Sequence, residues 1–80
     1  MRVEVRLFAT FAGFAPTKRA GASFDVVLPD AASVDDLVRH LGIPPDDVHL
    51  TMVDGHIVHN RNAPLAEGAR LGLFPPVGGG

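Results

Sequence analysis

The sequence contains no cysteine, no tryptophan and no tyrosine, and Lys18 is its only lysine. Without cysteine the chain can form no disulfide, no thiolate zinc site and no thiol nucleophile. It also lacks any apolar run near the roughly 20 residues that span a bilayer. The alternating start at residues 1–6 is unlike a signal peptide. We therefore expect a small cytoplasmic protein without a membrane partner.

Positive charge is scarce as well. Seven basic residues stand against nine acidic ones, for a net charge of −2, so we expect no nucleic-acid partner. The four histidines have no spacing typical of metal ligands, and we expect no metal site. His49 and His56 could face each other across a hairpin, but surface positions are the favoured interpretation. Asn60-Arg61-Asn62 could bind an anion, although a polar loop is favoured there too.

The first half of the chain predicts two strands and a helix. Polar and apolar residues alternate over 2–8 and again over 23–28, which is typical of half-buried strands. Residues 10–22 have no period and read as a long loop. Ser33 is a good helix N-cap, with Asp36 completing a capping box. One apolar stripe follows, and Gly42 suits a left-handed helix end; the stripe contains Val34, Leu37, Val38 and Leu41.

The second half predicts three more strands. Residues 48–53 are strand-like, and the hairpin signal Asp54-Gly55 leads into a short return strand over 56–58. Residues 70–74 alternate again. This order predicts an α+β fold of the β-grasp type, a mixed sheet with one helix packed across one face. We expect a single domain over 1–80, with a core containing Val3, Val5, Leu7, Val26, Leu28, Leu37, Leu41, Leu71 and Leu73.

The end of the chain is its most unusual feature. Pro75 and Pro76 cannot continue sheet pairing and hold the backbone extended. The last residues, Gly78, Gly79 and Gly80, have no side chains, so we expect a flexible tail over 75–80. A glycine-rich terminus is often only a frayed end. Here a stiff segment projects the glycines from a strand, which favours a functional tail ending in a reactive carboxylate.

Alternation also predicts a docking surface. The pattern places Arg6 and Phe8 of the first strand, with Arg70, Gly72 and Phe74 of the last, on the face opposite the helix. We expect the two phenylalanines to form an exposed apolar patch at the base of the tail, as partner surfaces often do. The alternative is that the loop containing Phe11 and Phe14 covers Phe8.

The chain resembles the MoaD/ThiS family of ubiquitin-like sulfur carriers. The resemblance rests on residues 7–9, 33–37 and 53–55, and above all on the closing Leu73-Phe74-Pro75-Pro76-Val77-Gly78-Gly79-Gly80. That ending is most similar to the small subunit of molybdopterin synthase. The resemblance implies a ubiquitin-like β-grasp carrier that is not itself an enzyme and binds no cofactor.

The resemblance also implies partners and a cycle. An adenylating enzyme related to ubiquitin-activating enzymes would use ATP to activate Gly80, and a sulfurtransferase would supply the sulfur of a thiocarboxylate. The tail, with Pro75, Pro76, Val77, Gly78 and Gly79, would insert into a large synthase subunit and deliver sulfur to a pterin precursor. Three alternatives stay open: a carrier for thiamine, cysteine or tungsten-pterin pathways, a ubiquitin-like protein modifier, and a β-grasp interaction module.

Overall fold

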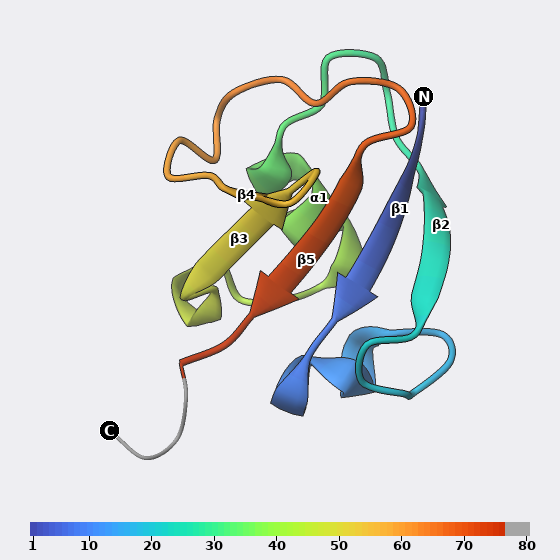
Figure 1. Cartoon of the computed structure of the whole chain (residues 1–80), viewed down its shortest axis with the longest axis vertical. Coiled ribbons are helices and arrows are strands. Elements are labelled where there is room, and N and C mark those ends of the chain that lie inside the picture. The colour runs from blue at the N-terminus through green and yellow to red at the C-terminus, as the bar shows by residue number, and fades with distance from the viewer. Residues whose placement is uncertain (77–80) are drawn as a thin grey trace.

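The structure, a computed structural model that describes residues 1–76, contains one five-stranded mixed sheet with the order β2-β1-β5-β3-β4 (Figure 1). Strands β1 and β5 run parallel, and the other neighbouring pairs are antiparallel. The bounds are β1 Arg2–Leu7, β2 Ser23–Val27, α1 Val34–Leu41, β3 Leu50–Val53, β4 His56–Ile57 and β5 Arg70–Phe74, with 3-10 turns η1 Ala9–Phe14 and η2 Pro45–Asp47.

Helix α1 lies across one face of this sheet and leaves the other face open (Figure 1). The predicted α+β, β-grasp arrangement is therefore confirmed, and the first and last strands pair at the centre of the sheet. Within residues 1–76, no helix combines the length and the apolar character that crossing a bilayer requires.

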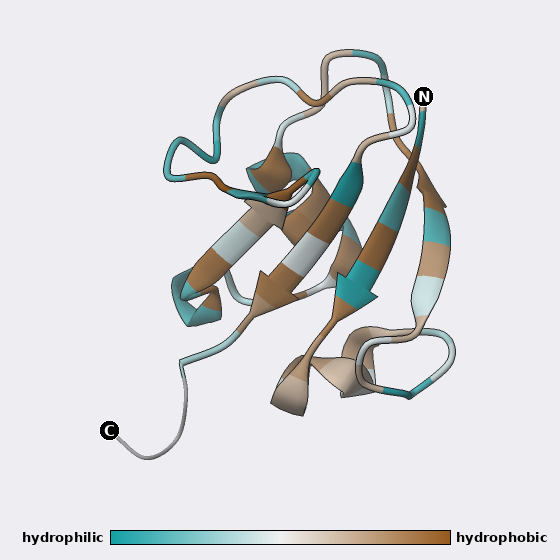
Figure 2. Cartoon of the chain, in the orientation of Figure 1, coloured by the Kyte–Doolittle hydropathy of each residue, from teal (hydrophilic) through white to brown (hydrophobic). Residues whose placement is uncertain are grey.

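The core lies between α1 and the covered face of the sheet. Figure 2 shows the alternation of apolar and polar residues along β1 and β5 that produces this burial. Eight of the nine predicted core residues are buried, and Leu41 is the exception because it ends the helix and is only half-buried. The core also gains Phe11, Ala15 and Ile43 from segments without any periodic pattern.

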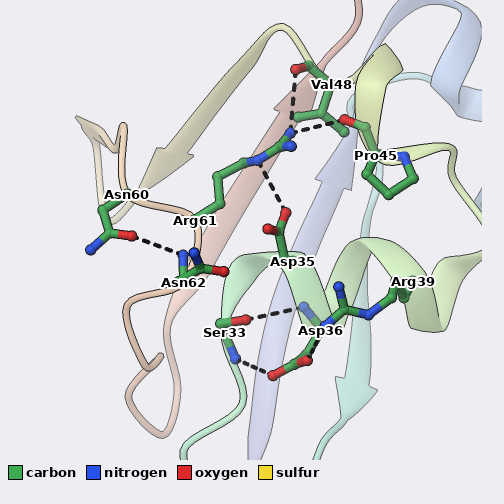
Figure 3. Close-up of polar contacts among 9 residues, drawn as sticks. All are labelled: Ser33, Asp35, Asp36, Arg39, Pro45, Val48, Asn60, Arg61 and Asn62. Carbon is green, nitrogen blue, oxygen red and sulfur yellow. Dashed lines mark hydrogen bonds and ion pairs between the residues drawn. The ribbon is translucent and has the colours of Figure 1, made fainter.

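The capping box at the start of α1 is present in both directions (Figure 3). The backbone N–H of Asp36 donates to Ser33 Oγ over 3.2 Å, and the backbone N–H of Ser33 donates to Asp36 Oδ2 over 2.9 Å. At the other end Gly42 adopts φ 80°, the left-handed conformation expected from its position. The hydrogen bond from the Ser33 backbone, with that from the Arg39 side chain, holds the pKa of Asp36 below its ordinary value.

We expect Asp36→Asn to lower the melting temperature by a few degrees at neutral pH and by much less in acid. Because the folded-state pKa is lowered, the ionised carboxylate stabilises the fold above roughly pH 4, the pKa of an unfolded aspartate. This contribution is lost as the pH falls through the folded-state pKa. Thermal denaturation of both proteins at pH 7 and in acid measures the difference.

The exposed Asp46 of η2 offers the matched control, since Asp46→Asn removes the same charge outside the capping box of α1. A difference between wild type and Asp36→Asn that is equally large at both pH values would contradict the role of the ionised cap.

Two differences from the expected elements are larger than the one-residue shifts at the ends of β1, β2 and β4. The long loop over 10–22 begins instead with the 3-10 turn η1, which Ala9 enters at φ 52°. Such short turns carry no repeating pattern that a sequence could reveal. Strand β3 begins at Leu50 rather than Val48, because the turn η2 holds the Val48 N–H on the carbonyl of Pro45.

Candidate functional site

Two phenylalanine rings stack on the open face of the sheet. Phe8 follows β1 and Phe74 ends β5, and their ring centroids lie 4.3 Å apart with an angle of 5° between the planes. They meet because β1 and β5 are parallel with Leu7 opposite Leu73, so the next residues lie side by side. The predicted juxtaposition at the base of the tail is therefore present.

The rings are half-buried, not exposed as expected. A Cβ atom at Gly72 would lie 3.3 Å from Phe8 Cε2 and 3.4 Å from Phe74 Cε1, and one at Gly21 would lie 3.5 Å from Phe8 Cε1. The ring of Phe8 thus rests between two glycines from different segments. The alternative, that the loop containing Phe11 and Phe14 covers Phe8, holds in part: Gly21 of this loop lies against the Phe8 ring, while Phe11 and Phe14 pack edge to face on each other at 6.3 Å.

The predicted arginines lie beside this ring pair. Arg6 is exposed and forms an ion pair with Glu4 at 3.5 Å. The backbone of Arg70 is held by the hairpin turn, because its N–H donates to Asp54 Oδ1 over 3.0 Å and its carbonyl accepts from the Asp54 N–H over 2.8 Å. A shallow cavity of about 250 Å³ lies between these groups, lined by Glu4, Arg6, Phe8, Met52, Gly55, Arg70, Leu71, Gly72 and Phe74.

A second cavity, of about 290 Å³ and mostly apolar, lies where the chain leaves the sheet. Its lining includes Phe74, Pro75 and Pro76 of the tail base, with His49 and Leu50 of the neighbouring segment. The N–H of His49 donates to the carbonyl of Phe74 over 2.9 Å, which holds the last residue of β5 in the sheet. Pro75 is half-buried and Pro76 is exposed.

The remaining predicted tail residues lie outside the described part of the chain. These are Val77, Gly78, Gly79 and Gly80. The expectation that the tail over 75–80 is flexible and that Gly80 is the reacting residue therefore stays a prediction.

The polar loop at residues 60–62 has a structural use (Figure 3). Arg61 Nε lies 3.0 Å from Asp35 Oδ1, an ion pair without a directed hydrogen bond to that oxygen. Arg61 Nη1 donates to the carbonyls of Pro45 over 3.1 Å and Val48 over 3.4 Å. Its guanidinium ties this loop to α1 and η2, so the favoured interpretation of a polar loop fits better than an anion site.

The four histidines do not form a single cluster. His56 pairs with Val53 in the hairpin, while His49 bonds β5, so the two do not face each other. All four histidines are exposed, and no three metal-ligating side chains cluster anywhere in residues 1–76.

One family matches most of the sequence. The sequence profile of the ThiS family matches residues 5–80, which include the end of β1, the whole of β5 and the terminal glycines. The chain belongs to the ThiS family. No curated protein sequence matches the chain.

Solved structures give this ThiS-family chain the ubiquitin-like β-grasp fold. SAMP1 from Haloferax volcanii is 26% identical, with a TM-score of 0.70 and coverage of 100% of both chains. A putative molybdopterin converting factor subunit 1 from Pyrococcus furiosus is 27% identical, with a TM-score of 0.68 over 96% of this chain and 99% of that one.

A third similar structure is a complex. It contains subunits 1 and 2 of the molybdopterin-converting factor from Helicobacter pylori; the matching chain is 28% identical, with a TM-score of 0.62 and full coverage of both chains. These likenesses give the ThiS-family chain the fold of a ThiS/MoaD-like sulfur carrier or a ubiquitin-like modifier.

The sequence pattern alone did not indicate that Gly72 is part of the candidate site. Alternation placed it on the open face, but nothing in the local pattern showed that two rings pack against it. A lone glycine inside a strand is a signal for close approach by other groups, and in this ThiS-family chain that signal applies.

We expect Phe74→Ala to weaken partner binding by about 1–3 kcal/mol, because half of the stacked pair is lost from the candidate docking surface. Titration calorimetry with the cognate adenylating enzyme, well below the melting temperature, measures the loss. Phe14→Ala is the matched control, since Phe14 is 40% exposed and does not line the cavity beside the ring pair. Equal binding by the two variants would contradict the assignment of the ring pair to the docking surface.

Proposed function

We propose that this ThiS-family protein is a sulfur carrier whose C-terminal Gly80 is adenylated and then converted to a thiocarboxylate. The observation that carries the proposal is the family match, which extends through the glycines to residue 80. The fold supports it, since β5 runs from the centre of the sheet directly into Pro75 and Pro76 (Figure 1). The chain itself catalyses nothing in this scheme, because its partners supply the catalytic groups.

The chemistry needs two activations by other proteins. A carboxylate oxygen of Gly80 attacks the α-phosphorus of ATP, and pyrophosphate leaves. The terminal sulfur of a persulfide on a sulfurtransferase then attacks the carbonyl carbon, and AMP leaves. A thiol then attacks the cysteine sulfur of the resulting acyl disulfide and breaks the S–S bond. The outer sulfur stays on Gly80 as the thiocarboxylate, and the thiol forms a disulfide with the cysteine of the sulfurtransferase. The folded domain provides binding energy remote from the reacting carbon.

Within this class we propose the role of the small subunit of molybdopterin synthase. The Phe74-Pro75-Pro76-Val77 segment before the glycines favours it, as do the two similar structures described as molybdopterin-converting factor subunit 1. The loaded tail would enter a large subunit and deliver sulfur to a pterin precursor. The partners are then an adenylating enzyme, a sulfurtransferase and that large subunit.

A ubiquitin-like modifier is the second candidate. The similarity to SAMP1, whose other solved structure is described as a small archaeal modifier protein, favours it. The same adenylated Gly80 would then react with a lysine amine of a target protein instead of a sulfur donor. Sulfur carriage for thiamine, cysteine or tungsten-pterin pathways uses the same first steps.

We expect the full chain, incubated with ATP, its adenylating enzyme and a sulfur source, to gain the mass difference between sulfur and oxygen. Intact-protein mass spectrometry measures the gain, and fragmentation places it at Gly80. Addition of the large synthase subunit and the pterin precursor should return the mass to its starting value. Conjugates with other proteins in place of this gain would favour the modifier. The absence of both the mass gain and the conjugates would contradict both candidate functions.

A further inference from the structure

The cavity on the open face is lined in part by Gly72, which has no side chain. Gly72 lies in the middle of β5, and a Cβ atom there would press on both stacked rings at 3.3 and 3.4 Å. Met52 is opposite Gly72 in the β3–β5 register and lines the same cavity. Because residue 72 has no side chain, both rings can lie close to the backbone of β5. The walls of the cavity include these two aromatic rings and a flexible thioether that adapts to apolar groups.

Charge is unevenly distributed around this cavity. Two arginines and one glutamate line it, although the whole chain has a net charge of −2. Arg6 is already paired with Glu4, whereas Arg70 forms no ion pair within residues 1–76. The nearest turn carboxylate, that of Asp54, accepts instead from the Arg70 backbone. The rim thus carries one guanidinium free to bind an anionic group.

We infer that the adenylating enzyme inserts an apolar side chain into the cavity beside Gly72 and places a carboxylate against Arg70. The inference rests on the proposed function, since it names the chemistry of the surface that docks this domain. An apolar anchor beside an acidic residue complements the apolar walls and the positive rim together. Complementary charge at such a rim raises the association rate and aids selection of the correct partner.

The test compares two variants with matched controls. Gly72→Ala puts a methyl group against both rings of the cavity wall, so the rings have to shift, and Gly13→Ala adds the same methyl group where nothing lies within 4 Å. Arg70→Gln removes the rim charge, and Arg39→Gln removes an equal charge from α1, where Arg39 pairs with Asp36. Dissociation constants for the full chain and its purified adenylating enzyme are measured at low and high salt.

We expect Gly72→Ala to bind about tenfold more weakly at both salt concentrations, because displaced rings no longer form the apolar contact surface. We expect Arg70→Gln to bind at least about fivefold more weakly at low salt, with the difference shrinking at high salt as the charge is screened. Both controls should bind like the unchanged protein. If Gly72→Ala melts far below wild type, Met52→Trp replaces it, filling the cavity from the opposite wall.

The inference requires both losses. Full-strength binding by either variant overturns it, as does a loss in Arg70→Gln that does not depend on salt. Failure of the proposed function gives a different result, because the unchanged protein would then neither bind the adenylating enzyme nor gain sulfur at Gly80.

Discussion

Deletion of Gly80 should nearly abolish sulfur transfer while leaving docking intact. The shortened chain still ends in two glycines, Gly78 and Gly79, so its carboxylate has the same chemical nature. That carboxylate lies one residue, roughly 3.3–3.6 Å, short of its place against the nucleotide. Since a misplacement of even 1 Å can lower a rate about 100-fold, we expect the loss to be at least of that order.

Single-turnover adenylation and thiocarboxylate formation measure this loss, and calorimetry with the adenylating enzyme measures docking. Phe74→Ala provides the converse control, because it leaves the tail length unchanged and weakens docking. A deletion variant that is loaded and donates sulfur at the normal rate would contradict the proposal that tail length sets the geometry of activation.

Leu37→Ala should lower the free energy of unfolding by about 2–4 kcal/mol, the usual cost of truncating a fully buried leucine. Leu37 is 0% exposed and lies on the buried face of α1, in the same cluster as Val5 and Leu73. A domain this small has only about 3–5 kcal/mol of stability from its core. Most of the margin against unfolding would therefore be lost.

Urea denaturation followed by circular dichroism measures the change. Leu41→Ala is the matched control on the same helix, since Leu41 is only half-buried and its truncation should cost less. Equal denaturation midpoints for the two variants would contradict the central position of Leu37 in the core.

The end of the first strand and the end of the last strand meet at the candidate site because of one topological feature. Strand β1 is the first in the sequence and β5 the last, yet they are parallel neighbours in the middle of the sheet. The residue that follows β1 therefore lies beside the residue that precedes the tail. A partner that contacts Phe8 and Phe74 is already positioned next to the segment that it has to receive.

The sequence by itself determined the features whose causes are local. Alternation with period two identified β1, β2 and β5, because side chains of a strand point to opposite faces in turn. Ser33, Asp36 and Gly42 identified both ends of α1 through capping groups a few residues apart. The hairpin at Asp54-Gly55 followed from two residues that tolerate positive φ, and they adopt 50° and 82°.

Only the tertiary structure decided how distant segments meet. Gly72 and Gly21 limit the exposure of Phe8, and Arg61 ties its loop to Asp35, through contacts between residues far apart in the chain. The turn η1 and the burial of Phe11 likewise depend on packing against the end of the sheet. No pattern of period 2 or 3.6 encodes such contacts, because they arise from strand register and side-chain packing after the chain has folded.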